Sequence, residues 1–253
     1  MTAAVSLHAL PGIPAVQQGD DLAALIRDGL ARAGLRLQPY DVLVLAQKIV
    51  SKAEGRIVDV ATIAPSPEAV ELAAKVQKDP RLVQVILNES ARVVRARPNV
   101  LIVEHKRGWV MANAGVDHSN VAPPDGVDRV LLLPADPDAS AAALRAELAS
   151  GMPFGVVIND SFGRAWRRGT MGIAIGAAGL PALLDLRGNP DLFGRILEVS
   201  ISGFADEIAA AASLVQGQGA EGQPVVLVRG LAWEQPAHGA AELVRPAAED
   251  MFR

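Results

Sequence analysis

The stretch GVVINDSFGRAWRRGT, residues 155–170, begins as a short apolar run and continues into a segment crowded with polar and charged side chains. The run 155–158 predicts a buried β-strand, because a short uninterrupted apolar run fits a strand covered on both faces. An acid, a hydroxyl and three arginines follow at once, and we expect them to form a loop. The stretch therefore predicts a sheet in which the end of one strand carries reactive groups.

Further strands and helices surround this stretch without regular alternation, so we expect an α+β fold of mixed sheets with packed helices. We interpret residues 1–253 as a single unit built from two closely associated, interleaved subdomains. The segment 172–184 remains open between helix and strand. The expected strands are residues 41–45, 56–60, 100–103, 109–112, 130–133, 196–202 and 225–228. The expected helices are residues 22–30, 138–149 and 205–214, with two more beginning at Ser66 and at Asp79-Pro80.

Composition limits the classes of function. The 253 residues include no cysteine, so any metal must be held by oxygen or imidazole, which favours Mg²⁺ or Mn²⁺. A net charge of -4 and an aromatic content of 4% argue against a nucleic-acid partner. No apolar run reaches the roughly 18 to 20 residues that span a bilayer, and the N-terminus lacks a secretory pattern. We therefore expect a cytoplasmic protein with no membrane contact.

Two polar segments offer ligands for a metal. In residues 159–170, a carboxylate and a hydroxyl at a strand end can hold a hard cation, and arginine forks can bind phosphate or carboxylate oxygens. A solvated loop with local salt bridges explains the same residues. Residues 113–120, NAGVDHSN, offer Asp117 as a second ligand, although an Asx turn accounts for them on local grounds.

Three further segments could bind a nucleotide, but none of them is specific to nucleotide binding. Residues 47–56, QKIVSKAEGR, supply two lysines and an arginine for a triphosphate, or else a basic turn in solvent. Residues 217–224 hold three glycines, yet they lack the Rossmann spacing and its downstream acid, so taken alone they fit a flexible loop better. Residues 10–13 form an expected turn. The Walker A pattern is absent from the chain, so neither a P-loop nor a Rossmann fold is expected.

Together and in this order, these segments resemble the coenzyme F420-0:L-glutamate ligase family, which also forms the ligase half of a longer two-part actinobacterial enzyme. The resemblance begins at Leu10-Pro11 and ends at VVLVRG, residues 225–230, so it covers nearly the whole chain. It implies that GTP converts the carboxylate of a lactyl-phospho-deazaflavin, F420-0, into an acyl phosphate. The amine of L-glutamate then displaces phosphate, and further glutamates join through γ-linkages. It also implies a homodimer with an intertwined interface.

The resemblance further implies a site, residue by residue. Asp117 and Asp160 would hold one divalent ion, Mg²⁺ or Mn²⁺, and Ser161 and Gln218 a second. We assign Arg164, Arg167 and Arg168 to substrate phosphate or carboxylates and to charge in the transition state. The residues implied to surround GTP are Leu10, Pro11, Gly12, Ile13, Gln47, Lys48, Lys52, Asn120, Gln216, Gly217, Gln218, Gly219, Ala220, Glu221, Gly222 and Gln223.

Two positions depart from the family pattern, and two other functions stay open at this stage. Ala165 stands where proline is usual, and Ser161 stands where threonine is common, which keeps the hydroxyl. A metal-dependent phosphatase or nucleotide hydrolase would use the same acids and arginines without glutamate. A non-catalytic nucleotide-binding protein would need the basic segments but not both carboxylates.

Overall fold

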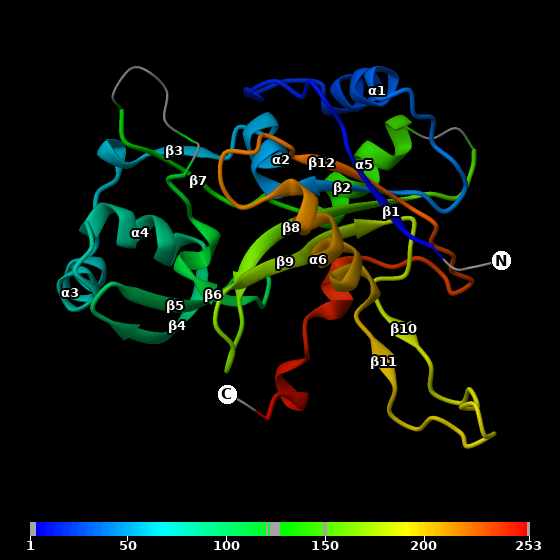
Figure 1. Ribbon diagram of the computed structural model, residues 1–253. Helices are drawn as coiled ribbons and strands as arrows, with labels where there is room; N and C mark the ends of the chain where they lie inside the picture. The colour runs from blue at the N-terminus through cyan, green and yellow to red at the C-terminus, as the bar shows by residue number, and fades with distance from the viewer. Residues whose placement is uncertain (1–3, 120, 122–126, 149–150, 252–253) are drawn as a thin grey trace.

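A mixed five-stranded sheet lies at the centre of the fold (Figure 1). The computed structural model describes residues 4–119, 121, 127–148 and 151–251. Strands β2 and β8 are parallel, and the other neighbouring pairs in this sheet are antiparallel. The strands, in their order across the sheet, are β1 (Ser6–Ala9), β12 (Val225–Arg229), β2 (Val42–Ala46), β8 (Gly155–Gly163) and β9 (Thr170–Ala178).

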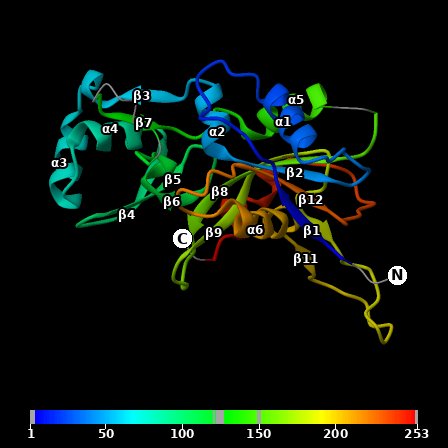
Figure 2. The same ribbon diagram turned by 45° about the horizontal axis from the view of Figure 1, so that its top comes forward.

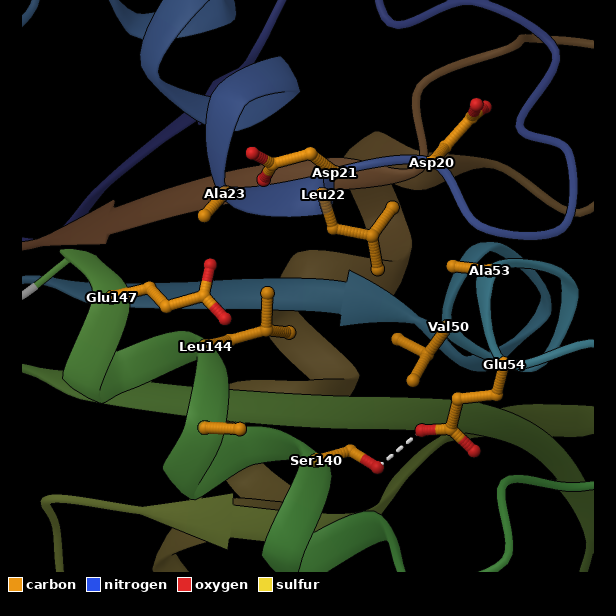
Figure 3. Close-up of a pocket in the computed structure, with 11 residues that line it drawn as sticks. Asp20, Asp21, Leu22, Ala23, Val50, Ala53, Glu54, Ser140, Leu144 and Glu147 are labelled. Carbon is orange, nitrogen blue, oxygen red and sulfur yellow. Dashed lines mark hydrogen bonds between the residues drawn. The ribbon is translucent and has the colours of Figure 1, made fainter.

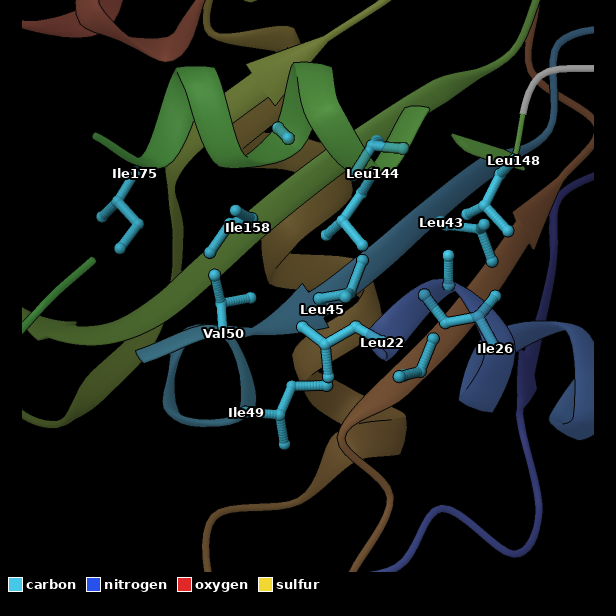
Figure 4. Close-up of a cluster of buried hydrophobic side chains, with 14 of the residues drawn as sticks. Leu22, Ile26, Leu43, Leu45, Ile49, Val50, Leu144, Leu148, Ile158 and Ile175 are labelled. Carbon is cyan, nitrogen blue, oxygen red and sulfur yellow. The ribbon is translucent and has the colours of Figure 1, made fainter. Parts of the chain in front are cut away.

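Helices cover both faces of this sheet, as Figure 2 shows. Leu43 and Leu45 of β2 pack beneath α1 (Leu22–Arg32) and α5 (Pro137–Leu148), in the core drawn in Figure 4. The intervening Val42 and Val44 face α6 (Phe204–Gln216) on the other side. Successive side chains of a strand point to opposite faces. Because both faces of the sheet are buried, its central strands read as continuous apolar runs.

A second part of the chain, between β2 and β8 in sequence, has its own core. The buried side chains of Val83 and Ile86 meet those of Leu101 and Val103 in this core. It lies to the left of the central sheet in Figure 1. Its elements are α2 (Gln47–Ala53), which links it to the sheet, β3 (Ile57–Asp59), η1 (Val60–Thr62), α3 (Pro67–Val76), α4 (Pro80–Asn88), β4 (Ser90–Arg97), β5 (Val100–His105), β6 (Val110–Ala112), η2 (Asn113–Gly115) and β7 (Arg129–Leu131).

A narrow arm, residues 184–202, extends from the body of the protein (Figure 1). Its base is the short pair β10 (Leu184–Asp185) and β11 (Ile201–Ser202). The chain closes with η3 (Ala240–Leu243) and η4 (Ala247–Glu249). Among the described residues, no helix is both long enough and apolar enough to cross a membrane.

The α+β architecture is confirmed, and so are two predicted helix starts. Ser66 and Asp79 each accept a hydrogen bond from a backbone N–H of the first turn, and a proline follows each cap. The segment left open, 172–184, begins as strand β9. Gly172 allows that strand to approach α6, since a Cβ at this position would lie 2.6 Å from the carbonyl oxygen of Ala209.

Other local predictions were wrong. The expected polar loop over residues 47–56 is mostly helix α2, and the expected loop after Ile158 is a continuation of strand β8 to Gly163. Pairing with β9 holds those polar residues in the sheet. The expected strand 196–202 shrinks to β11, because residues 196–200 lie in the exposed arm and make only scattered backbone hydrogen bonds with residues 186–190. Strands β1 and β4 were not predicted.

A buried ion pair fastens the last strand of the central sheet to the chain that enters β2. Asp41 is 1% exposed, and its carboxylate accepts hydrogen bonds from Arg229 Nε at 2.9 Å and Arg229 Nη2 at 2.8 Å. The backbone N–H of Gln38 donates to the same carboxylate at 2.7 Å. Removing one partner of such a pair leaves an uncompensated buried charge, which is more costly than the pair itself.

We expect Arg229→Met to destabilise the protein by about 3 kcal/mol, which lowers the melting temperature by roughly 5 to 10 °C. The matched control is Arg92→Met, because the Arg92–Glu104 pair lies at the surface with 49% of the arginine side chain exposed. That change should cost less than about 1 kcal/mol. Equal shifts in calorimetry for the two variants would show that the buried pair has no special role.

Candidate functional site

The segments predicted to bind the nucleotide meet at one edge of the central sheet. Strands β2 and β8 run parallel, and β12 runs against β2, so the ends of β2 and β8 lie beside the start of β12. The Leu10 N–H donates to the Val225 carbonyl at 2.9 Å, and the Ala46 N–H donates to the Pro224 carbonyl at 2.8 Å. The turn at residues 10–13, helix α2 and the loop at residues 217–223 are thereby brought together.

Side chains join the end of β8 to that glycine-rich loop. Asn159 Nδ2 donates to Gln216 Oε1 at 2.8 Å, and Ser161 Oγ donates to Gln218 Oε1 at 2.7 Å. Ser161 and Gln218, which the family resemblance assigns to one ion, are therefore in direct contact. Within the loop, the side chain of Glu221 accepts a hydrogen bond from the Gly219 N–H at 2.8 Å.

The second core supplies Asp117 to this edge. Reciprocal backbone bonds between Asp117 and Leu131, at 2.9 and 3.1 Å, place it opposite helix α2. Its carboxylate pairs with Lys48 Nζ at 2.8 Å and accepts hydrogen bonds from Ser119 N at 2.7 Å and Ser119 Oγ at 2.8 Å. Burial acts to raise the pKa of Asp117, but the bonds from Lys48 and Ser119 outweigh it and hold that pKa below its usual value.

Asp160 is the most perturbed carboxyl group at this edge. Burial raises the pKa of Asp160 to about 6, and the negative charge of Asp117 adds to the rise. The Ser161 N–H and the Lys48 ammonium oppose it. Asp160, Asp117 and Lys48 therefore share one electrostatic environment, although they come from three separate segments. Groups perturbed in this way cluster at functional sites.

These donors fit a hard divalent cation. Two carboxylates that repel each other are stabilised by a cation between them, and Lys48 already places a positive charge on one of them. Buried amide oxygens of Asn113 and Asn159 have no hydrogen-bond partner. Within the described ranges, no three acidic or histidine side chains converge, so a metal here would take its remaining ligands from hydroxyl, amide or substrate oxygens.

Helix α2 presents two lysines to the same edge. Burial lowers the pKa of Lys52, and the charge of Lys48 one turn earlier lowers it further. An anion beside these ammonium groups would relieve that repulsion. Gln47 has a different place, because it is buried and its Oε1 accepts a hydrogen bond from Ser51 Oγ at 2.8 Å.

The three arginines lie at the tip of the β8–β9 hairpin, beyond the last paired residues Gly163 and Thr170. Arg167 and Arg168 are exposed and have no ion pair within the described part of the chain, and Arg164 has a buried Nη1 without a hydrogen-bond partner. Arg164, Arg167 and Arg168 are therefore held on the same strand pair as Asp160 but beyond it. Asn120, assigned to the nucleotide, falls outside the described residues.

Sequence reasoning missed Ser119 and Asn159. Ser119 bonds both Asp117 and Lys48, and its signal was the Asp-x-Ser spacing of an Asx turn. Asn159 carried no separate signal, because its role depends on pairing between β8 and the end of α6.

A separate cavity of about 290 Å³ lies between the start of α1, the end of α2 and helix α5 (Figure 3). Its rim carries Asp20, Asp21, Glu54 and Glu147, and Glu54 accepts a hydrogen bond from Ser140. None of the predicted site residues lines it. Four carboxylates repel a triphosphate, so the cavity does not compete with the sheet edge as a nucleotide site.

The profile of the F420-0:Gamma-glutamyl ligase family matches residues 12–230, which include the carboxylates, the lysines and the glycine-rich loop of this edge. The chain belongs to this family. It is 44% identical to the coenzyme F420:L-glutamate ligase of Methanothermobacter thermautotrophicus over 253 residues, covering 98% of this chain and 99% of that one. The Methanopyrus kandleri ligase of the same name is 46% identical, covering 94% and 93%. The Archaeoglobus fulgidus ligase is 42% identical, covering 98% and 96%.

From the raised pKa of Asp160 we predict how the stability of the folded protein depends on pH. A rise from 3.8 to about 6 costs the folded state at most about 3 kcal/mol above pH 6, where the group is ionised in both states. The cost disappears below pH 4, where it is protonated in both. Without metal at pH 7.5, Asp160→Asn should therefore melt several degrees above the wild type. Added Mn²⁺ should stabilise the wild type but not the variant.

Asp206→Asn is the matched control for this experiment. Burial also raises the pKa of Asp206, which accepts a hydrogen bond from the Ala174 N–H on the α6 side of the sheet. This variant should also melt above the wild type, yet keep the full response to Mn²⁺. An equal response in Asp160→Asn would remove Asp160 from the metal site.

Proposed function

We propose that this chain is a GTP-dependent ligase that joins L-glutamate to the carboxylate of F420-0 and then extends the product through γ-linkages. The observation that carries the proposal is the electrostatic coupling of Asp117, Asp160 and Lys48 at the edge where the predicted nucleotide segments meet. The family of the chain and the names of its relatives support the coarser part of the proposal, the ligation of glutamate to F420.

The nucleotide lies, in this proposal, across the ends of β1 and β2. The turn at residues 10–13 and the loop at residues 216–223 flank it, and Lys48 and Lys52 face its phosphates. Lysine ammonium groups are compact point charges suited to a triphosphate. Binding of the triphosphate would relieve the repulsion that lowers the pKa of Lys52.

Asp117 and Asp160 would hold one divalent ion and Ser161 with Gln218 a second. Such ions, Mg²⁺ or Mn²⁺, neutralise phosphate charge that would otherwise repel an attacking carboxylate. Lys48 would then leave Asp117 for the nucleotide. Its place on Asp117 in the free protein keeps that carboxylate ionised and oriented.

The proposed reaction has two steps. A carboxylate oxygen of the acceptor attacks the γ-phosphorus, the bond to the β-phosphate oxygen breaks, and GDP leaves with the electron pair. The amine of L-glutamate then attacks the acyl carbon, phosphate leaves, and the amine proton passes to water. Arg164, Arg167 and Arg168 are proposed to meet the acceptor's phosphate and the carboxylates of glutamate, because arginine forks bind such oxygens bidentately.

Asp160→Asn should reduce glutamyl transfer at least 10- to 100-fold at limiting metal, because the change deletes charge but preserves size and hydrogen bonding. The assay incubates protein with GTP, Mn²⁺, L-glutamate and F420-0 and follows added glutamyl units by mass spectrometry. Asp206→Asn is the folded control and should keep near wild-type activity. A wild type that hydrolyses GTP without adding glutamate would instead identify a nucleotide hydrolase and overturn the proposal.

We also propose that the protein is a homodimer, with the arm at residues 184–202 reaching onto a second copy. Leu192, Phe193 and Val199 are 98%, 94% and 86% exposed, although each is strongly apolar. Apolar groups gathered on a projecting segment mark a protein interface. An arm that crosses to a second copy would also agree with the intertwined interface implied by the resemblance.

Phe193→Glu should therefore convert a dimer into a monomer in sedimentation velocity, because it places a charge where an apolar contact is expected. Val70→Glu on α3 is the control, since Val70 is an apolar residue that is 50% exposed, and α3 lies far from the arm (Figure 1). It should leave the dimer intact. A wild type that sediments as a monomer would refute the proposed assembly.

A further inference from the structure

The ammonium group of Lys48 contacts a carboxylate that the proposed mechanism assigns to a metal. Lys48 Nζ lies 2.8 Å from Asp117 Oδ2 and also meets the hydroxyl of Ser119, which donates to the same oxygen at 2.8 Å. The Ser119 N–H donates to the other oxygen, Asp117 Oδ1, at 2.7 Å. Both carboxylate oxygens of Asp117 are therefore already engaged in the free protein.

The same ammonium group lies near both acids of the proposed metal site. The positive charge of Lys48 acts on Asp160 as well as on Asp117. A divalent ion held by the two acids would therefore lie close to a second cation, and like charges at such distances repel each other. The ion and Lys48 compete for Asp117.

Helix α2 gives Lys48 a second place to bind. Its charge sits on a flexible aliphatic stem, and 28% of the side chain is exposed, so rotation of the side chain alone can take the ammonium group away from Asp117. Lys52 lies one turn further along the same helix and adds a second positive charge. A triphosphate beside α2 would attract both ammonium groups and draw Lys48 off the carboxylate.

We propose that Lys48 exchanges between Asp117 and the nucleotide, and that this exchange couples the binding of the metal to the binding of the nucleotide. The inference rests on the proposed GTP and metal sites and adds how their occupancy is regulated. In the free protein, Lys48 prevents Asp117 from binding an ion tightly. By thermodynamic linkage, the metal and the nucleotide then raise each other's affinity by the same factor. After the nucleotide has left, the return of Lys48 to Asp117 favours release of the ion.

The exposure of the ion pair sets the size of the effect. Couplings between two binding sites are typically about 5- to 150-fold. The side chains of Lys48 and Asp117 are 28% and 37% exposed, so solvent screens their attraction and holds the coupling near the lower end of that range. We therefore expect Lys48 to weaken metal binding in the free protein about fivefold.

The test uses Lys48→Met, which removes the ammonium group but keeps a long side chain, and Lys48→Gln as a second neutral variant. Lys52→Met is the matched control, because it deletes an equal charge one turn along the same helix. Titration calorimetry measures the Kd for Mn²⁺ without nucleotide and the Kd for the β,γ-imido analogue of GTP without metal. The Kd for Mn²⁺ is then measured again with the analogue bound.

Without nucleotide, both Lys48 variants should bind Mn²⁺ about fivefold more tightly than the wild type, although they bind the analogue more weakly. Lys52→Met should also bind the analogue more weakly, but its Kd for Mn²⁺ should stay within about twofold of the wild-type value. The analogue should tighten Mn²⁺ binding less in the Lys48 variants than in the wild type. Opposite changes in two affinities identify exchange, because a loss of structure would weaken both.

Two outcomes overturn the exchange. Unchanged or weaker Mn²⁺ binding in the folded Lys48 variants would show that the lysine does not compete with the ion. Equal tightening in Lys52→Met would show a general effect of charge instead. Circular dichroism and melting temperature establish folding, and Lys48→Gln keeps the test open if Lys48→Met does not fold. Glutamyl transfer by the wild type is measured alongside, so an active wild type with either outcome would refute the exchange and leave the ligase function standing.

Discussion

The parallel pairing of β2 with β8 is the constraint on which the site depends. Parallel neighbours end at the same edge of a sheet, so helix α2 leaves the sheet next to Asp160. A parallel pair also needs a long crossover, and this chain uses that crossover to build a second core. Asp117 returns from that core to the same edge, where it meets Lys48.

The site is electrostatically costly in the free protein. The negative charge of Asp117 adds to the raised proton affinity of buried Asp160, and two lysines one helical turn apart repel each other. The ion pair between Lys48 and Asp117 offsets part of this electrostatic cost. A bound metal ion would neutralise the two carboxylates, and a bound triphosphate would neutralise the two lysines. The free site therefore holds unfavourable electrostatic energy that ligand binding would relieve.

Much of the fold follows from local sequence, and the site follows only in part. The strand at residues 155–158 and the caps at Ser66 and Asp79 are visible because apolar runs and capping residues act over a few neighbours. Helix α2 could not be predicted from the sequence, since it is short and its start has no side-chain cap. Convergence of Asp117 with Asp160 depends on the crossover, which spacing along the chain does not encode. The expectation that these two acids act together came from the family resemblance.

The two carboxylates are held by different hydrophobic cores. Asp160 belongs to the central sheet, whereas Asp117 is positioned by the strand pair and helices of the crossover. Cores of this kind open with different free energies, and local opening of either one separates the two acids. In the proposed ligase, the upper temperature of activity is then set by the weaker core, and a stabilising substitution confined to the stronger one leaves that limit unchanged.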